Sequence, residues 1–176
     1  LLDIRDAGFA GAFAAIVDDR WESESDVRDT DGSVIADVRR RGDEALLDLT
    51  RRFDGFDRSA CGLRLAESSL REARAACPAE TLAALELAAE RIATFHASQK
   101  PEDRRQVDAL GVVQGYRWRP VDAVGLYVPG GLAAYPSTVL MNALPARVAG
   151  VPRIVMTTPM PRGEINPLVL AAAALA

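Results

Sequence analysis

The hydrophobic positions of the first hundred residues recur with the period of a helix. Apolar residues gather around Phe9–Val17, which predicts one helix followed by an exposed, acidic arm up to about residue 30. From Ser33 to Leu49 the apolar positions again have helical spacing. They predict one or two helices that break near Gly42-Asp43, where Asp43 is well placed to cap the second helix.

The next segment is predicted to contain a short strand and two more helices. Residues 63–65 are expected to form the strand, and Ser68 or Ser69 to cap the helix after it. The clearest helix is expected at residues 79–98, where Lys100-Pro101 ends the pattern because a residue before proline avoids helical geometry. Its apolar stripe is predicted to consist of Leu82, Leu85, Leu87, Ala89, Ile92 and Phe95.

After residue 110 the pattern turns to the short apolar runs that are typical of strands. Residues 112–118 and 123–128 are both predicted to be strands, and the second leads into Pro129-Gly130-Gly131. Ligands bind at the carboxyl ends of strands in open α/β sheets, where glycines let backbone N–H groups approach an anion. The loop lacks the G-x-G-x-x-G pattern, so an ordinary turn is the other interpretation.

A helix and a second strand follow this loop. The helix is predicted from Val139 to about Ala149, with a cap at Ser137 or Thr138 and Gly150 at its end. Residues 153–159 form a continuous apolar run, which is typical of a strand that is buried on both faces. The order strand, loop, helix, strand predicts a βαβ unit in a parallel α/β sheet.

Composition and charge exclude several classes of protein. Of the 176 residues, 49% are hydrophobic and 26% are charged, which is typical of a globular chain. The net charge of −4 argues against nucleic acid or an anionic membrane as a partner, because both select for positive surfaces. No apolar run approaches the roughly 20 residues that span a bilayer. The two cysteines, Cys61 and Cys77, make no disulfide framework, so we expect reduced thiols in a cytoplasmic protein.

The ends of the sequence predict a fragment. Residue 1 is Leu rather than Met, and the first residues are too short an apolar stretch for a signal peptide. Residues 167–176 are predicted to start a helix that no glycine, proline or cationic residue ends. We therefore expect the chain to be part of a longer protein.

His96, the only histidine, is the first candidate for chemistry. It is predicted to share a helical face with Gln99, and such a pair could bind a metal or transfer a proton. A catalytic zinc site needs three protein ligands, so a structural role for His96 is favoured and no metal ligand is predicted. Cys61 and Cys77 have no basic neighbour and are poor candidates for a nucleophile.

Tyr127 is the second candidate, because it lies at the end of the strand expected at residues 123–128. Its ring could stack on a cofactor base, or its hydroxyl could donate to a ribose or a phosphate. The other interpretation is a half-buried strand tyrosine that only packs.

The same strand and its loop carry a more specific signal. The stretch Val124–Gly131 (VGLYVPGG) and the residues after it, 134–143 (AYPSTVLMNA), resemble the histidinol dehydrogenase family. Other stretches share the resemblance, which spans nearly the whole chain from about residue 30: 38–46 with Thr50 and Phe53-Asp54, 95–101, 145–151 and 165–173.

This resemblance implies the activity of a whole enzyme. It implies a zinc- and NAD-dependent oxidation of L-histidinol to L-histidine, the last step of histidine biosynthesis, in two hydride transfers through L-histidinal. It also implies a homodimer whose active sites use both subunits. Of the family's functional residues only the tyrosine that contacts NAD matches here, as Tyr127. The zinc ligands, the acid–base pair and the other NAD contacts are expected beyond residue 176, so the chain alone is expected to be inactive.

These interpretations divide the chain into three parts. Residues 1–30 are expected to be an N-terminal helix and arm, 31–122 the mostly helical part of a first α/β domain, and 123–176 the start of a second, Rossmann-like NAD-binding domain. The expected fold class is α/β, with a helical N-terminal region leading into an incomplete Rossmann-like parallel sheet that is truncated at the C-terminus. The alternative, from another functional class, is a non-catalytic α/β module that binds a nucleotide or a partner.

Overall fold

The chain forms two compact units, Leu1–Thr50 and Arg51–Ala176. The computed structural model describes residues 3–60, 62–130 and 134–176, with the backbone alone for 16–27. The elements are α1 (Phe9–Arg41), α2 (Asp43–Asp54), α3 (Glu67–Ala76), α4 (Ala79–Ala97), β1 (Arg104–Val107), β2 (Val113–Tyr116), β3 (Val124–Tyr127), α5 (Pro136–Ala149), β4 (Ile154–Thr157), the 3-10 helix η1 (Pro161–Gly163) and α6 (Pro167–Leu175).

Helix α1 is much longer than the sequence pattern predicts. It runs from Phe9 to Arg41, so the expected end near Val17 and the exposed arm after it are wrong. The reason is that nothing in this stretch interrupts the helical hydrogen bonds, since the first proline of the chain is Pro78. Acidic clusters lower the hydrophobic signal along a helix without ending it.

Helices α1 and α2 meet at Gly42, which confirms the predicted break. Gly42 has φ 61°, a conformation in which glycine is not strained. Asp43 is the first residue of α2, and its side chain accepts no hydrogen bond within the described residues, so Asp43 is not the expected cap.

Arg41 forms ion pairs with Asp37 at 2.7 Å and with Asp48 at 2.8 Å, which join the two helices. The Arg41 guanidinium, followed by that of Arg40, holds the pKa of Asp37 below its usual range.

The segment between α2 and α3 also departs from the expectation. Residues 63–65 form no strand, and a run this short has no neighbouring strand to pair with in the described part of the chain. Helix α3 begins at Glu67 without a side-chain cap, so Ser68 and Ser69 lie inside its first turn. Cys77 follows α3 as a half-buried free thiol, and Cys61 lies outside the described residues.

Asp57 accepts two hydrogen bonds in a turn of this segment. Its carboxylate accepts hydrogen bonds from the hydroxyl and the backbone N–H of Ser59, which lower the pKa of Asp57 to about 2. A carboxyl whose pKa is lowered by folding stabilises the fold above its unfolded pKa, and this contribution disappears as the pH falls from about 4 to about 2. Asp57→Asn should therefore lower the unfolding free energy at pH 6 and change it little at pH 2. Urea unfolding at both pH values tests this, and an equal loss at both would contradict it.

Helix α4 confirms the clearest helical prediction and corrects its apolar stripe. Leu85, Ala88, Ala89 and Ile92 face the core, whereas Leu87 and Phe95 are exposed. Leu87 lies about 200° around the helix axis from Leu85, because each residue turns the helix by about 100°. The stripe is therefore narrower than the count of apolar residues predicts.

Strands β1 and β2 form an antiparallel hairpin. Arg104 pairs with Tyr116 and Val107 with Val113, so β2 confirms the central part of the strand expected at residues 112–118. Strand β1 was not predicted, because its sequence Arg-Arg-Gln-Val shows no apolar alternation. Asp108 closes the turn by accepting the N–H groups of Leu110 and Val112, each at 2.9 Å. Every residue of both strands is exposed.

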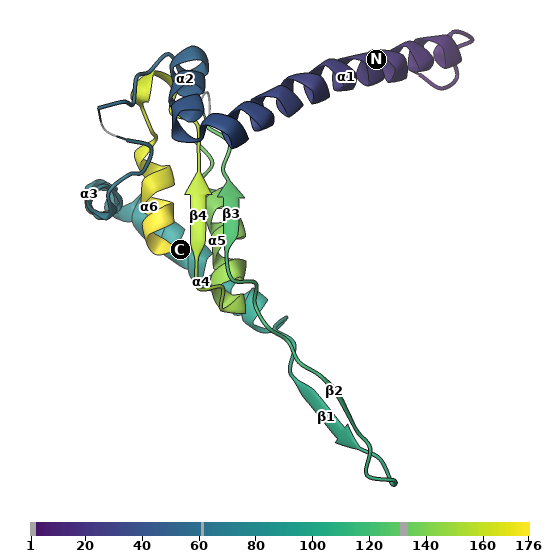
Figure 1. The fold of residues 1–176 in the computed structure, drawn as a ribbon, viewed down its shortest axis with the longest axis vertical. Helices are drawn as coiled ribbons and strands as arrows, with labels where there is room; N and C mark the ends of the chain where they lie inside the picture. The colour runs from purple at the N-terminus through teal and green to yellow at the C-terminus, as the bar shows by residue number, and fades with distance from the viewer. Residues whose placement is uncertain (1–2, 61, 131–133) are drawn as a thin grey trace. The chain divides into compact units, whose positions relative to one another are not determined.

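Strands β3 and β4 are parallel and joined by α5, which confirms the predicted βαβ unit. The register pairs Val124 with Ile154 and Tyr127 with Thr157. Helix α5 packs on both strands and on α4 and α6 (Figure 1). Burial alternates along both strands, and Val155 is 49% exposed, so the expectation that β4 is buried on both faces is wrong. Helix α5 packs on the two strands, and among the described residues the side chains that alternate with the half-buried ones, such as Tyr127 and Val155, are exposed.

The core joins the βαβ unit to the last helix. It consists of buried residues from β3's end, α5 and α6: Val128, Val139, Leu140, Leu144, Val169 and Ala172. Helix α5 begins at Pro136 after Tyr135, without the expected cap at Ser137 or Thr138, and ends at Gly150 with φ 88°, as predicted. Helix α6 confirms the expected last helix, and the side chain of Asn166 caps it by accepting from the N–H of Leu168 at 2.9 Å.

Candidate functional site

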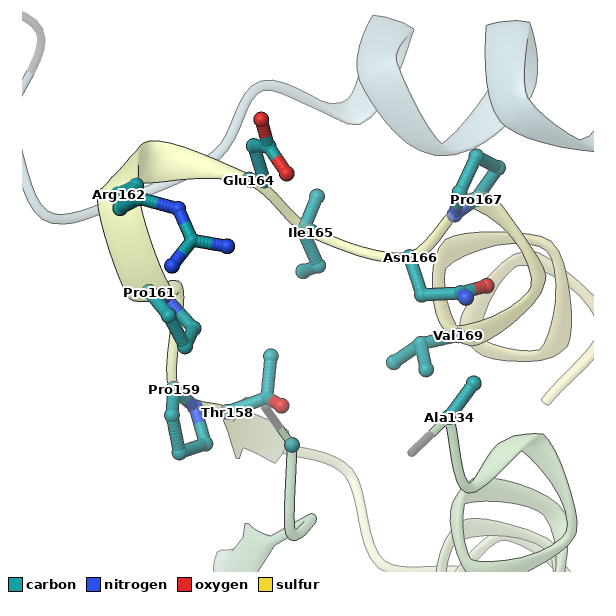
Figure 2. A pocket seen from close by; sticks show the side chains of 11 residues that line it. Ala134, Thr158, Pro159, Pro161, Arg162, Glu164, Ile165, Asn166, Pro167 and Val169 are labelled. Atoms are coloured by element: carbon teal, nitrogen blue, oxygen red, sulfur yellow. The ribbon is translucent and has the colours of Figure 1, made fainter. Parts of the chain in front are cut away.

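A cavity of about 310 Å³ lies at the carboxyl end of the parallel strands β3 and β4. Its walls come from the segment after β3, the segment after β4 and the start of α6 (Figure 2). Its lining includes four residues with polar side chains, Thr158, Arg162, Glu164 and Asn166, together with Gly130 and Val169. Parallel α/β sheets bind ligands at this edge, and the volume is at the lower end of ligand pockets.

Gly130 lets the two loops of the cavity approach each other. A Cβ atom built at Gly130 would lie 3.0 Å from the Oγ1 of Thr158 and 3.2 Å from the carbonyl oxygen of Pro159. The glycine loop expected after β3 is thus packed against the loop after β4. Gly130 is one of the residues that line the cavity. Gly131 lies outside the described residues.

Tyr127, the residue expected to contact a cofactor, ends β3 beside Thr157. Its side chain is 64% exposed and is not among those that line the cavity. An aromatic ring this exposed has little packing to lose if it is removed. The structure therefore places Tyr127 at the carboxyl end of β3 with its ring open to solvent.

The polar residues of the loop after β4 were not singled out from the sequence. Arg162 and Glu164 line the cavity, and neither side chain forms a hydrogen bond or an ion pair within the described residues. Arg162 has φ 56°, and among the described residues it is the single one other than glycine with a positive φ. The signal that could have found them is their position after the second parallel strand, where the same rule about strand ends applies.

Two residues from the segment after α2, Phe56 and Arg58, contact this loop. Arg58 is only 6% exposed, and its guanidinium donates to the carbonyl oxygen of Gly62 at 2.6 Å and to the Sδ of Met160 at 3.0 Å. The ring of Phe56 lies so close to Gly163 that a Cβ there would be 2.6 Å from Cε2 of the ring. The loop that carries Arg162 is thereby held by contacts with Arg58 and Phe56, neither of which lines the cavity.

His96 and Gln99 do share a helical face, as the spacing predicts. The Nδ1 of His96 lies 2.7 Å from the Oε1 of Gln99, in a hollow of about 650 Å³ that Trp118 and Arg119 also line. Asp103 lines it too, and the hydrogen bond from the backbone N–H of Trp118 lowers the pKa of Asp103. This hollow is lined by the end of α5 and the segment before β3, and it shares no lining residue with the cavity.

The described residues contain no group of three or more His, Cys, Asp or Glu side chains that could hold a metal ion. They also include no helix that is both long and apolar enough to cross a bilayer. Neither the hollow around His96 nor the cavity thus offers a zinc site from this chain's described residues.

Comparison with known proteins gives a consistent match. A family model described as histidinol dehydrogenase matches residues 18–176. Curated histidinol dehydrogenases from Rhodopseudomonas palustris, Gluconobacter oxydans and Rhodospirillum rubrum are 50%, 53% and 54% identical to the chain, over 99% of its length in each case. The chain spans 40–41% of the length of these relatives.

A solved structure gives the same match. The crystal structure of histidinol dehydrogenase from Elizabethkingia anophelis superposes with a TM-score of 0.78 and is 34% identical. The match covers 85% of this chain and 34% of that chain. The likeness confirms the expected α/β fold class.

Proposed function

This chain belongs to the histidinol dehydrogenase family, and we propose that it forms the N-terminal part of an enzyme that oxidises L-histidinol to L-histidine. The observation that carries the proposal is the identity of about 50% with such enzymes over 99% of the chain. The alcohol loses two hydrides in succession, through L-histidinal, and one water supplies the second oxygen of the carboxylate. The whole protein would act as a cytoplasmic homodimer in histidine biosynthesis.

The cavity fits a phosphate-bearing cofactor. Gly130 lies where the two loops approach each other, and the guanidinium of Arg162 has no partner among the described residues. The cavity also lies at the carboxyl end of parallel strands, where such sheets bind phosphate-bearing ligands. NAD would accept the hydride when bound. This chain would contribute part of its binding surface, with residues 123–176 starting a Rossmann-like domain, 31–122 supplying the mostly helical part of a first domain, and 1–30 containing the first part of the long helix α1.

Zinc does not fit the described residues of this chain, because no group of candidate ligands comes together. We therefore assign no step through a metal to these residues. Zinc ligands and an acid–base pair would belong to parts of the protein beyond residue 176.

Tyr127→Ala in the full-length enzyme should raise the Michaelis constant for NAD about tenfold. Loss of ring stacking and of one hydroxyl hydrogen bond would remove about 1.4 kcal/mol, which is one decade in affinity. The Michaelis constant for histidinol should change much less. Steady-state kinetics with each substrate varied, beside a thermal melt, measures this. Tyr127→Phe is the matched control, since it keeps the ring. A variant that melts early and keeps the normal NAD constant would show that Tyr127 only packs.

The proposed function is tested by the protein encoded by the whole reading frame that contains this chain. It should reduce NAD when L-histidinol is added, release two equivalents of NADH per histidine formed, and restore growth of a histidine auxotroph that lacks this enzyme. Absence of all three from a folded, metal-loaded protein would refute the proposal and favour a binding module.

A further inference from the structure

The strongest unassigned feature of the molecule is the guanidinium of Arg162. The side chain points into the cavity at the carboxyl end of β3 and β4 (Figure 2). It has no hydrogen-bond or ion-pair partner within the described residues, although Glu164 is two residues away on the same loop. A cation that lines a cavity without a protein partner is suited to bind an anion.

The backbone conformation of Arg162 is a second observation that supports a ligand-binding role for this residue. Its φ of 56° is a left-handed conformation that is sterically unfavourable for a residue with a Cβ atom. Such strain persists where the surrounding structure imposes it, and it is concentrated at ligand sites. Here Arg58, through Met160, and Phe56, against Gly163, impose the path of the loop. The backbone from which the Arg162 side chain extends is therefore held by contacts within the protein.

The position of the loop indicates which anion would be bound. In a parallel α/β sheet a dinucleotide lies across the carboxyl ends of the strands, with its phosphates and its adenosine ribose near the loops that follow them. The loop after β3 presents Gly130, and the loop after β4 presents Arg162 across the same cavity. Arginine matches the geometry of a phosphate through two parallel N–H donors.

We propose that Arg162 binds a phosphate group of the adenosine diphosphate half of the cofactor, an assignment that rests on the proposed NAD-dependent function. Arg162 then fixes the cofactor at the edge of β4, while Tyr127 contacts it at the edge of β3. The shared chemistry is a phosphate on an adenosine, so ADP and NAD both serve as probes, and adenosine and inorganic phosphate separate the two parts of the contact.

The test is calorimetric binding of NAD, ADP, adenosine and inorganic phosphate to the full-length protein and its variants. Arg162→Ala should weaken NAD and ADP binding about tenfold, the size of one charge-assisted hydrogen bond, and leave adenosine binding unchanged. Arg162→Lys should recover part of the loss. Arg162→Gly should lose binding equally and melt no lower than the parent protein, because glycine adopts this backbone without strain. Arg153→Ala is the matched control, since Arg153 lies at the amino end of β4 and is exposed.

The outcomes separate this inference from the proposed function. If the parent protein binds NAD and Arg162→Ala binds it equally well, the inference is overturned and the proposed function stands. If the parent protein binds ADP through Arg162 and does not bind NAD, the phosphate site stands and the NAD-dependent function fails. Binding of neither nucleotide overturns both. Binding of inorganic phosphate alone, with no preference for ADP, overturns the assignment to a nucleotide.

Discussion

Leu140→Ala is expected to lower the free energy of unfolding by about 3 kcal/mol, the usual cost of a cavity in a well-packed core. Leu140 is 1% exposed and lies on α5 among Val128, Leu144 and Val169, where β3, α5 and α6 meet. Urea unfolding followed by circular dichroism measures the change. Because the same contacts hold α6 and the loop before it, NAD binding should weaken as well.

Met141→Ala is the matched control for this experiment. Met141 is the next residue of the same helix and is 63% exposed, so its truncation opens no core cavity. Its effect should stay within about 0.5 kcal/mol, as for other surface substitutions. Equal losses for Leu140→Ala and Met141→Ala would contradict the position of the core.

Gly163→Ala is expected to lower the free energy of unfolding by about 2 kcal/mol and to weaken NAD binding. Two costs add, because Gly163 has φ 80° and its Cβ would lie 2.6 Å from the ring of Phe56. The backbone alone accounts for about 1 kcal/mol, and displacing the ring accounts for the rest. The ring and the loop that carries Arg162 have to move apart to accept the methyl group.

Gly150→Ala isolates the backbone cost. Gly150 has φ 88°, and the closest atom to a Cβ there is 4.0 Å away, so only the conformational cost should appear. The double variant Phe56→Ala with Gly163→Ala should lose less than the two single variants added together, because the clash disappears. Additive losses would show that the ring and the glycine are not in contact.

In the unit Arg51–Ala176, the sequence predicts a helix or strand wherever that element is long enough to show its hydrophobic period. Helix α4 and the unit β3–α5–β4 were predicted within a few residues, and Gly150 was correctly placed at the end of α5. Both the 3.6-residue and the two-residue periods arise from the backbone itself. Helix α1 is longer than the sequence predicts, because its charged stretch has no clear apolar period to detect.

The candidate site was predicted only in part. The glycine loop was predicted because it follows a recognisable strand, and Gly130 does line the cavity. Tyr127 ends the same strand without lining the cavity, and its contact with a cofactor stays a prediction. Arg162 was missed, because an arginine in a loop has no periodic signal. The role proposed for it rests on the direction of its side chain, its missing partner within the described residues and its positive φ.

The sequence by itself determined the family, through motifs such as VGLYVPGG, and the parallel βαβ unit, through apolar runs that are local in the chain. Only the tertiary structure decided which face of β4 is covered and where the cavity lies. The contact between Arg58 and Met160 joins residues 102 positions apart. A contact of this kind leaves no trace in a local pattern, because it depends on how separate elements pack. The path of the loop that carries Arg162 therefore depends on packing against Phe56 and Arg58, which are distant in the sequence.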